Sequence, residues 1–317
     1  MKYSIITPVY NREDCIDRCI NSVIKQLDSN VQIEHIIVDD GSNDKTPLIV
    51  QEYADKNPHI NYIKLDKNKG TNAARNAAIK VASGDFCILL DSDDYFVDNA
   101  INIINNVVEN NSEYKYFMFA PDDKVDEYKT ISILNKKQAI ISFNDIIINN
   151  IFTDFIHVIN TDIIKKYPFN EFIRIYEGVF FLRFYCEAQK MLFSNTIVTI
   201  RERKRNDSIT KDFFQIDKKT IEKSMVSLSL KIEWFKDIYL QIAPNKLQNI
   251  YVEMLDNLLR LSDYKKAKQI LTETENLNFT VPKRYKVIYN MKLEGLYFLI
   301  KKYYLYIRYY VLKDNFN

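Results

Sequence analysis

The chain has 317 residues, of which 47% are hydrophobic and 27% are charged, a balance typical of soluble globular proteins. A formal net charge of only +2 gives no case for nucleic-acid binding through bulk charge. No stretch reaches the roughly 18 apolar residues of a membrane-spanning helix, and no signal-peptide pattern opens the chain. We therefore expect a cytoplasmic protein that binds no nucleic acid.

The four cysteines fall in predicted helices or a strand and form no CxxC pair, so we expect reduced residues in packed surroundings rather than disulfides or metal ligands. They are Cys15, Cys19, Cys87 and Cys186.

The first 110 residues alternate between strand and helix patterns. Apolar strand patterns cover residues 2–8, 31–40, 60–66 and 85–91, and helical spacing covers 15–27, 46–55, 72–82 and 97–108. This alternation predicts βαβ units with right-handed crossovers and a mostly parallel α/β sheet.

The rest of the chain is less regular at first and then helical. Strand patterns cover residues 114–120, 157–160 and 193–203, with a helical pattern at 177–190. From about residue 216 the pattern is helical, with Pro244 and Pro282 as breaks. We therefore divide the chain into 1–110, 111–215 and 216–317.

Polar clusters follow three of the predicted strands, at Pro8–Tyr10, Asp39–Asp40 and Asp91–Asp93. Parallel sheets bind ligands at the carboxyl ends of their strands, so these clusters should meet at one edge. The carboxylates of Asp91, Asp93 and Asp94 repel one another there. A positive charge should offset them, and a divalent metal is the first candidate.

Four segments resemble, in order and at matching spacing, the sequence blocks of bacterial family 2 glycosyltransferases. They read SIITPVYN at 4–11, IIVDDGSNDKT at 36–46, NKGTNAARNAAI at 68–79 and GDFCILLDSDD at 84–94. The resemblance implies a GT-A fold, a Rossmann-like, mostly parallel sheet flanked by helices. It also implies inverting, metal-dependent transfer from a nucleotide sugar, with 1–110 binding the donor, 111–215 binding the acceptor and a helical extension at 216–317.

By this resemblance, Thr7, Pro8 and Tyr10 border the base and ribose, with Glu13 nearby, unless Tyr10 only packs its loop. Asp39 and Asp40 end the second strand, and a carboxylate there can accept the N3–H of uracil, which favours a uridine nucleotide. Asp40 is the better candidate. The alternative is that one of the two caps the following helix.

The planar guanidinium group of Arg75 is suited to binding a phosphate or the ribose beside it, and the alternative is that Arg75 forms only a surface salt bridge. The amide of Asn72 could face the same site.

In the DxD segment, Asp91 and Asp93 should point the same way, with Ser92 between them, and share Mn²⁺ or Mg²⁺ with the diphosphate. The resemblance places Asp91 near ribose or metal and Asp93 on the metal. The alternative is a helix-capping turn.

Inverting transfer needs a general base, which in this family comes from a Glu-Asp pair opening a helix. The matching segment is IRIYEGVFFLRFY at 173–185, where Glu177 fits the first member but Gly178 replaces the aspartate. Glu177 acts as the base, or the base lies elsewhere, or the enzyme is impaired. Asp154 and Glu171 are alternatives without positional support.

The segment RERKRNDSIT at 201–210 resembles a basic block of the family, in which Arg203 and Arg205 would contact the diphosphate; the alternative is a solvated basic strand.

Residues 285–313 combine apolar and basic side chains at helical spacing. One interpretation is peripheral contact with the inner face of the plasma membrane, and the alternative is packing on the catalytic domain or on a second copy in a homodimer.

The predicted function is transfer of a hexose or N-acetylhexosamine from a UDP-sugar donor to a hydroxyl of a bacterial surface glycan, such as lipopolysaccharide or capsule, or of a lipid-linked oligosaccharide acceptor. One rival is a transferase-like binding subunit that lost its base at Gly178. A nucleotidyltransferase is disfavoured, because VYNRED after the first strand lacks the expected glycine-rich loop.

Overall fold

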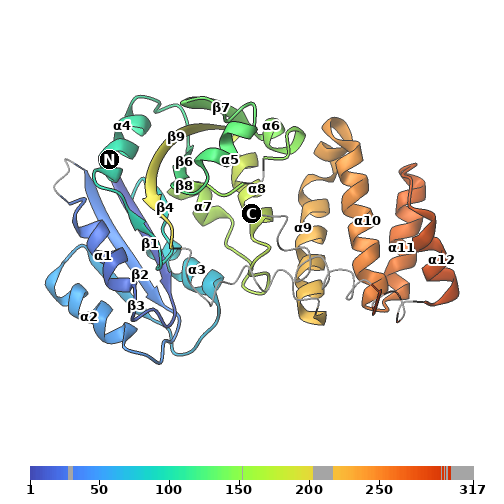
Figure 1. The fold of residues 1–317 in the computed structure, drawn as a ribbon, viewed down its shortest axis with the longest axis horizontal. Coiled ribbons are helices and arrows are strands. Elements are labelled where there is room, and N and C mark those ends of the chain that lie inside the picture. The colour runs from blue at the N-terminus through green and yellow to red at the C-terminus, as the bar shows by residue number, and fades with distance from the viewer. Residues whose placement is uncertain are drawn as a thin grey trace. The chain divides into compact units, whose positions relative to one another are not determined.

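A computed structural model describes residues 1–27, 31–151, 153–202 and 217–293, together with residues 295, 297, 299 and 300. The chain divides into two compact units, Met1–Arg205 and Asn206–Asn317 (Figure 1). The first unit holds all three of the polar clusters expected at strand ends. The described part of the second unit is helical, as the sequence pattern predicts.

One mixed sheet runs through the first unit. Among the described residues it has nine strands in the order β3-β2-β1-β4-β8-β6-β9-β5, with β7 paired to β9. The strands are β1 (Lys2–Val9), β2 (Gln32–Asp39), β3 (Ile60–Lys64), β4 (Phe86–Leu89), β5 (Tyr95–Phe96), β6 (Tyr116–Pro121), β7 (Gln138–Ser142), β8 (Ile156–Asn160) and β9 (Lys190–Ile200). The sequence pattern did not predict β5 or β7.

The predicted parallel arrangement is confirmed for the first four strands, where β1 pairs in parallel with both β2 and β4, and β2 with β3. The second half is mixed, because β8 runs antiparallel to both β4 and β6, whereas β6 and β9 are parallel. Strand β1 is buried on both faces, as expected for a central parallel strand.

Helices cover both faces of this sheet. The helices of the first unit are α1 (Ile16–Ile24), α2 (Thr46–Lys56), α3 (Thr71–Val81), α4 (Ala100–Glu109), α5 (Val125–Thr130), α6 (Phe143–Ile148), α7 (Thr161–Lys166) and α8 (Gly178–Ala188). Apolar residues of α1, α2 and α4 share one core cluster with the sheet, and α3 lies on the opposite side of β1–β3 (Figure 1). In α1, Ile16, Cys19, Ile20 and Val23 supply this face at helical spacing.

The second unit contains α9 (Lys218–Ile242), α10 (Pro244–Arg260), α11 (Tyr264–Asn276) and α12 (Lys283–Met291). Helix α10 packs against each of the other three. Asn257 of α10 donates to Ser224 of α9 at 3.1 Å, and the buried Asp256 accepts from Tyr285 of α12 at 3.1 Å. Within the ranges that the structure describes, no helix combines the length and the apolar character needed to cross a bilayer.

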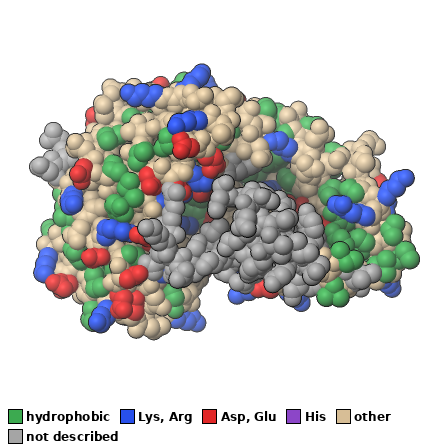
Figure 2. Space-filling view, in the orientation of Figure 1, with side chains coloured by type: hydrophobic (Ala, Val, Ile, Leu, Met, Phe, Trp, Pro, Cys, Tyr) green, Lys and Arg blue, Asp and Glu red, His purple; other side chains and the backbone are tan. Residues whose placement is uncertain are grey.

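Basic and acidic side chains are interspersed on the surface of the first unit. On the side that Figure 2 shows, outside the grey atoms, red and blue groups alternate and neither sign forms a continuous patch. This agrees with the small net charge. Any binding of a charged ligand must therefore depend on local side chains rather than on the field of the whole protein.

Candidate active site

The carboxyl ends of β1, β2 and β4 meet at one edge of the sheet. The N–H of Asp40 donates to the carbonyl of Val9 at 2.8 Å, and the N–H of Leu90 donates to the carbonyl of Ile6 at 3.0 Å. These hydrogen bonds continue the strand pairing past the ends of β2 and β4. The segments after all three strands are thereby held side by side.

Asp39 closes the turn that follows β2. Its Oδ1 accepts the N–H of Ser42 at 2.8 Å, and its Oδ2 accepts the Tyr62 hydroxyl at 3.0 Å. At the start of α2 it is Asp44, just before the helix, whose carboxylate accepts the N–H of the first helical residue, Thr46, at 2.9 Å. With its side chain fully buried, Asp39 serves the shape of the turn.

Asp40 shapes the loop that leads into α3. Its two carboxylate oxygens accept the N–H groups of Lys69 and Gly70, each at 2.7 Å. The loop also passes close to Gly41, whose φ is +74°, and a Cβ on Gly41 would lie 2.7 Å from the carbonyl carbon of Lys67. Asp40 is buried, and each of its carboxylate oxygens can still accept a second hydrogen bond.

The residues predicted to border the base and ribose differ in exposure. Thr7 is fully buried and its hydroxyl lies 2.9 Å from Nε2 of His35, and Pro8 is buried as well. The ring of Tyr10 is 37% exposed. Glu13 is exposed, and its carboxylate accepts a backbone N–H at the start of α2 at 2.8 Å. Only Tyr10 and Glu13 therefore present their side chains to solvent.

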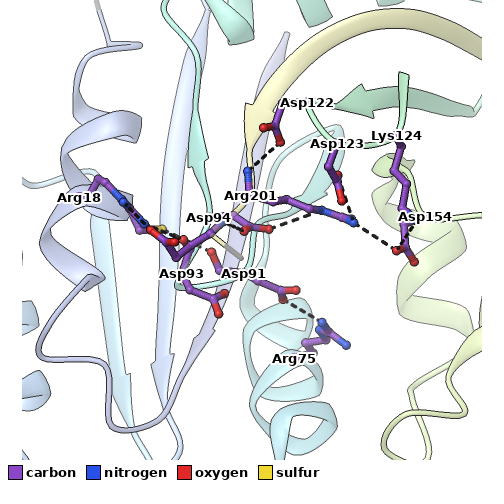
Figure 3. A network of polar contacts seen from close by, with 12 residues as sticks. Arg18, Arg75, Asp91, Asp93, Asp94, Asp122, Asp123, Lys124, Asp154 and Arg201 are labelled. Atoms are coloured by element: carbon purple, nitrogen blue, oxygen red, sulfur yellow. Dashed lines mark hydrogen bonds and ion pairs between the residues drawn. The ribbon is translucent and has the colours of Figure 1, made fainter. Parts of the chain in front are cut away.

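Arginines surround the acidic turn after β4 (Figure 3). Arg75 of α3 donates to Oδ1 of Asp91 at 2.9 Å, and Arg18 of α1 donates to the carbonyl of Asp93 at 3.1 Å. Asp91 and Asp93 point to the same side of the turn in Figure 3, whereas Asp94 points toward Arg201. Ser92, between them, is buried.

Charges set the protonation of Asp91. Loss of solvent works to raise its pKa, but the charge and hydrogen bond of Arg75, helped by Arg201 and Arg174, outweigh this and lower the pKa. The same pairing raises the pKa of Arg75, against its burial. Asp91 is therefore an ionised carboxylate with half of its side chain surface still exposed, at 52%.

Arg201 follows β9 and connects three acidic segments. Its guanidinium lies 3.2 Å from Asp154, 3.8 Å from Asp123 and 3.9 Å from Asp94. Burial raises the pKa of Asp94 to about 8, and the charges of Asp91 and Asp93 add to the effect. The sequence pattern did not single out Arg201 or Arg18, because both act on residues far away in the chain.

These arginines supply the positive charge that the acidic turn needs to fold, so charge repulsion alone does not require a metal. The described part of the chain holds no group of three or more His, Cys, Asp or Glu residues arranged around a metal. Mg²⁺ and similar ions are often held by one or two carboxylates together with substrate phosphates. The exposed carboxylate of Asp91 and the neighbouring Asp93 fit such a site, with oxygen ligands only.

A cavity of about 310 Å³ opens beside Asp91. Its lining comes from α3, the end of β4 and the turn after it, β8 with the segment before it, α8 with the segment before it, and the residue that follows β9. The residues are Arg75, Leu89, Leu90, Asp91, Asp94, Ile151, Thr153, Asp154, Phe155, Ile156, His157, Ile175, Glu177, Gly178, Phe181, Tyr185 and Arg201.

Glu177 lies in this lining at the start of α8, close enough to Arg75 and Arg174 for their charges to act on it. Burial raises the pKa of Glu177, and the two arginines only partly counter the effect. Gly178 is exposed, and a Cβ there would meet no atom within 4 Å.

The far wall of the cavity is aromatic. The ring of His157 stacks on Phe181 with 4.3 Å between ring centres, and its Nδ1 lies 2.9 Å from the Tyr116 hydroxyl. Burial and nearby arginines lower the pKa of His157 to about 3, so the ring is neutral. The sequence reasoning missed this histidine, which lies alone in a strand pattern with no motif around it.

Several predicted site residues lie outside the cavity lining. Asn72 is buried and donates to the carbonyl of Asn170 at 2.9 Å. Glu171 is exposed and does not line the cavity, whereas Asp154 does. Arg203 and Arg205 lie outside the described residues.

The profile of the family named Glycosyl transferase family 2 matches residues 4–168, which include the strand ends and the acidic turn. The chain belongs to this family. A curated relative, the glycosyltransferase GlyG of Streptococcus pneumoniae, is 24% identical over 297 residues, covering 86% of this chain and 91% of GlyG.

Another relative of this family 2 chain is the poly(ribitol-phosphate) beta-glucosyltransferase of Bacillus spizizenii. It is 40% identical over 102 residues, which cover 32% of this chain but only 16% of the relative. Similarity at this level of identity is therefore limited to about a third of the chain.

Two solved structures share the fold. Residues 1–349 of Staphylococcus aureus TarS, in complex with UDP-GlcNAc, superpose with a TM-score of 0.58 at 18% identity, covering 96% of this chain and 89% of that one. The mannosyltransferase PcManGT of Pyrobaculum calidifontis, in complex with GDP-Man and Mn²⁺, gives a TM-score of 0.58 at 15% identity, covering 95% and 86%. The expected GT-A architecture with a C-terminal helical region is thereby confirmed.

Proposed function

We propose that this family 2 protein transfers a hexose or N-acetylhexosamine from a UDP-sugar to a hydroxyl of a bacterial surface glycan or lipid-linked oligosaccharide, with inversion. The observation that carries the proposal is the meeting of Asp91, Arg75 and Glu177 around one cavity. Relatives that act on poly(ribitol-phosphate), and TarS solved with UDP-GlcNAc, support the uridine donor and the glycan acceptor.

In this proposal Tyr10 and Asp40 hold the nucleoside, and Asp91 and Asp93 hold Mn²⁺ or Mg²⁺. The bound cation would offset charge on the leaving diphosphate. PcManGT, solved with Mn²⁺, supports a metal of this kind. Arg75 keeps Asp91 ionised and oriented, since the two are joined by a charge-assisted hydrogen bond.

Glu177 acts as the general base in the same scheme. The acceptor hydroxyl transfers its proton to the Glu177 carboxylate while the hydroxyl oxygen attacks the anomeric carbon. A base works best when its pKa lies close to the working pH, and burial moves the pKa of Glu177 in that direction. His157 and Phe181 line the same cavity with aromatic rings.

The test is release of UDP from a panel of UDP-hexoses and UDP-N-acetylhexosamines, measured with Mn²⁺, with Mg²⁺ and with chelator. We expect metal-dependent release from one donor, its loss in Asp93→Ala, and a fall in kcat of about 10²- to 10⁴-fold in Glu177→Gln with acceptor present. Glu171→Gln is the matched control, because this exposed carboxylate lies on the same segment but outside the cavity. If no donor is turned over and UDP with Mn²⁺ leaves Tm unchanged, the transferase proposal is wrong.

Peripheral membrane contact remains part of the proposal. On α12 and just beyond it, Val287, Met291, Leu299 and Ile300 are exposed apolar residues, and residues 301–313 lie outside the described part. Exposed apolar side chains with neighbouring lysines suit an anionic bilayer surface. Cosedimentation with anionic vesicles, but not with neutral ones, is the expected result; a concentration-dependent dimer without vesicle binding would favour self-association instead.

A further inference from the structure

Helix α3 places three polar side chains on one face. Asn72, Arg75 and Asn76 stand at positions i, i+3 and i+4, which bring side chains together on a helix. Arg75 holds Asp91 in the acidic turn. The two asparagines point to another part of the chain, the segment between α7 and α8.

Asn76 pairs with the backbone of Phe169 in both directions. Its Nδ2 donates to the carbonyl of Phe169 at 2.8 Å, and its Oδ1 accepts the N–H of Phe169 at 2.8 Å. Asn72 adds a hydrogen bond to the carbonyl of Asn170 at 2.9 Å. The ring of Phe169 is buried and lies 5.9 Å from the Arg75 guanidinium. Both asparagines therefore fix the start of the segment that leads to Glu177.

The same segment contains a strained residue just before Glu177. Ile175 has a φ of +74°, in the left-handed region that β-branched side chains avoid. Such a conformation persists only where the surrounding contacts hold it. The segment is held at Phe169 and Asn170 by α3, and inside by the fully buried Ile173, whose carbonyl accepts the N–H of Tyr176 at 2.9 Å.

We propose that Asn76, assisted by Asn72, is a positioning residue for Glu177. One rigid helix then carries the arginine that orients Asp91 on the donor side, together with the amides that fix the segment delivering the base. The distance between donor and base is set by α3 rather than by a flexible loop. The inference rests on the proposed role of Glu177 as general base.

The experiment measures kcat and donor KM for Asn76→Ala and Asn72→Ala, with Asn110→Ala as control. Asn110 is an exposed asparagine, and among the described residues its side chain hydrogen-bonds only to Asn106 in the last turn of its own helix. Because small misplacements of a catalytic group cost about 10²-fold in rate, we expect kcat to fall about 10- to 100-fold in Asn76→Ala. Donor KM and the binding of UDP with Mn²⁺ should stay within about twofold, because Arg75 and Asp91 are untouched.

A double-mutant cycle separates positioning from simple loss of packing. If Asn76 acts through Glu177, Asn76→Ala should cost little more once Glu177→Gln has removed the base. Additive losses, or an unchanged kcat in Asn76→Ala, would overturn the inference and leave the transferase proposal standing. Full activity in Glu177→Gln would instead overturn the role of the base itself.

Amide hydrogen exchange gives a readout that does not depend on turnover. The N–H of Phe169 is protected by Asn76, so residues 169–177 should exchange faster in Asn76→Ala while α3 itself stays protected. Unchanged exchange over this segment would also overturn the inference. Asn72→Ala, which removes one hydrogen bond instead of two, provides the second variant if Asn76→Ala fails to fold.

Discussion

The variant Gly178→Asp tests which residue acts as general base in this chain, where glycine replaces the aspartate of the expected Glu-Asp pair. A Cβ at Gly178 would meet no atom within 4 Å, its φ is not left-handed, and the residue is exposed. The Cβ of the new side chain therefore fits without rearrangement. It would stand at the first position of α8 and beside the cavity.

Two effects make this variant more stable than the wild type. A carboxylate in the first turn of a helix contributes about 0.3–1 kcal/mol through the helix dipole. Replacing glycine at a compatible position adds about 0.4–1 kcal/mol by restricting the unfolded chain. Repulsion from Glu177 reduces the sum, so we expect a gain near 1 kcal/mol, or about 2–4 °C in Tm. Gly178→Asn has a side chain of the same shape but no charge, so it should show only the stabilisation that comes from restricting the unfolded chain.

Activity is the more informative measurement. Because Glu177 already serves as base in our proposal, kcat of Gly178→Asp should change by less than about tenfold, well below the roughly 100-fold or more that a general base contributes. In the double variant Glu177→Gln with Gly178→Asp, the new carboxylate should recover at least about tenfold of the activity lost in Glu177→Gln. UDP release with acceptor, followed in wild type and in each variant, checks these values.

One outcome would refute the reasoning. If Gly178→Asp alone raises kcat by about 100-fold or more, the size of a general-base effect, then Glu177 is not the base of the wild-type protein. The chain would then be an impaired member of its family, and the binding-subunit alternative would gain support. Gly178→Asn must leave kcat unchanged for that conclusion to hold.

Three further predictions concern pH and stability. Hydrogen bonds to the carboxylate of Glu34 outweigh its burial and lower its pKa from 4.5 to about 2. Ionised Glu34 therefore contributes up to about 3 kcal/mol to the free energy of unfolding. This contribution is present above pH 4.5 and is lost as the pH falls toward 2. Denaturant unfolding of Glu34→Gln should lack this pH dependence. In the same assay, Gly41→Ala should lower the free energy of unfolding by about 2–4 kcal/mol, because φ at Gly41 is +74° and the new Cβ would collide with the backbone of Lys67. Gly178→Ala is the control and should not lower it. Since burial raises the pKa of Glu177, the acid limb of kcat/KM should lie above pH 4.5 and disappear in Glu177→Gln; a limb at or below 4.5 would contradict the burial argument.

The parallel half of the fold was readable from the sequence because its signals are local. Each strand is a short apolar run followed by a polar turn, and the edge where Asp40 and Asp91 meet follows from the rule for parallel strands. Arg75 was found for the same reason, since it stands inside a recognisable block. Its partner is Asp91, only 16 residues away.

The rest of the site depends on contacts between distant segments. Arg201 reaches Asp94 across more than a hundred residues, and Asn76 reaches Phe169 across 93. No periodicity encodes such pairs, because they arise only once β8 and β9 have joined the sheet. The left-handed backbone of Ile175 is equally hidden, since the residue type argues against it and only the surrounding contacts enforce it.

The strand order has a consequence for synthesis on the ribosome. Strand β8 lies between β4 and β6, although it comes after both in the chain. Until residues 156–160 emerge, β4 presents an unpaired edge, and β6 has no neighbour through which to reach the first four strands. Exposed edges of this kind template unwanted pairing between chains. A nascent chain that stalls before residue 156 would therefore hold β1–β4 with an unpaired edge at β4, and this is the stage at which chaperones would matter most.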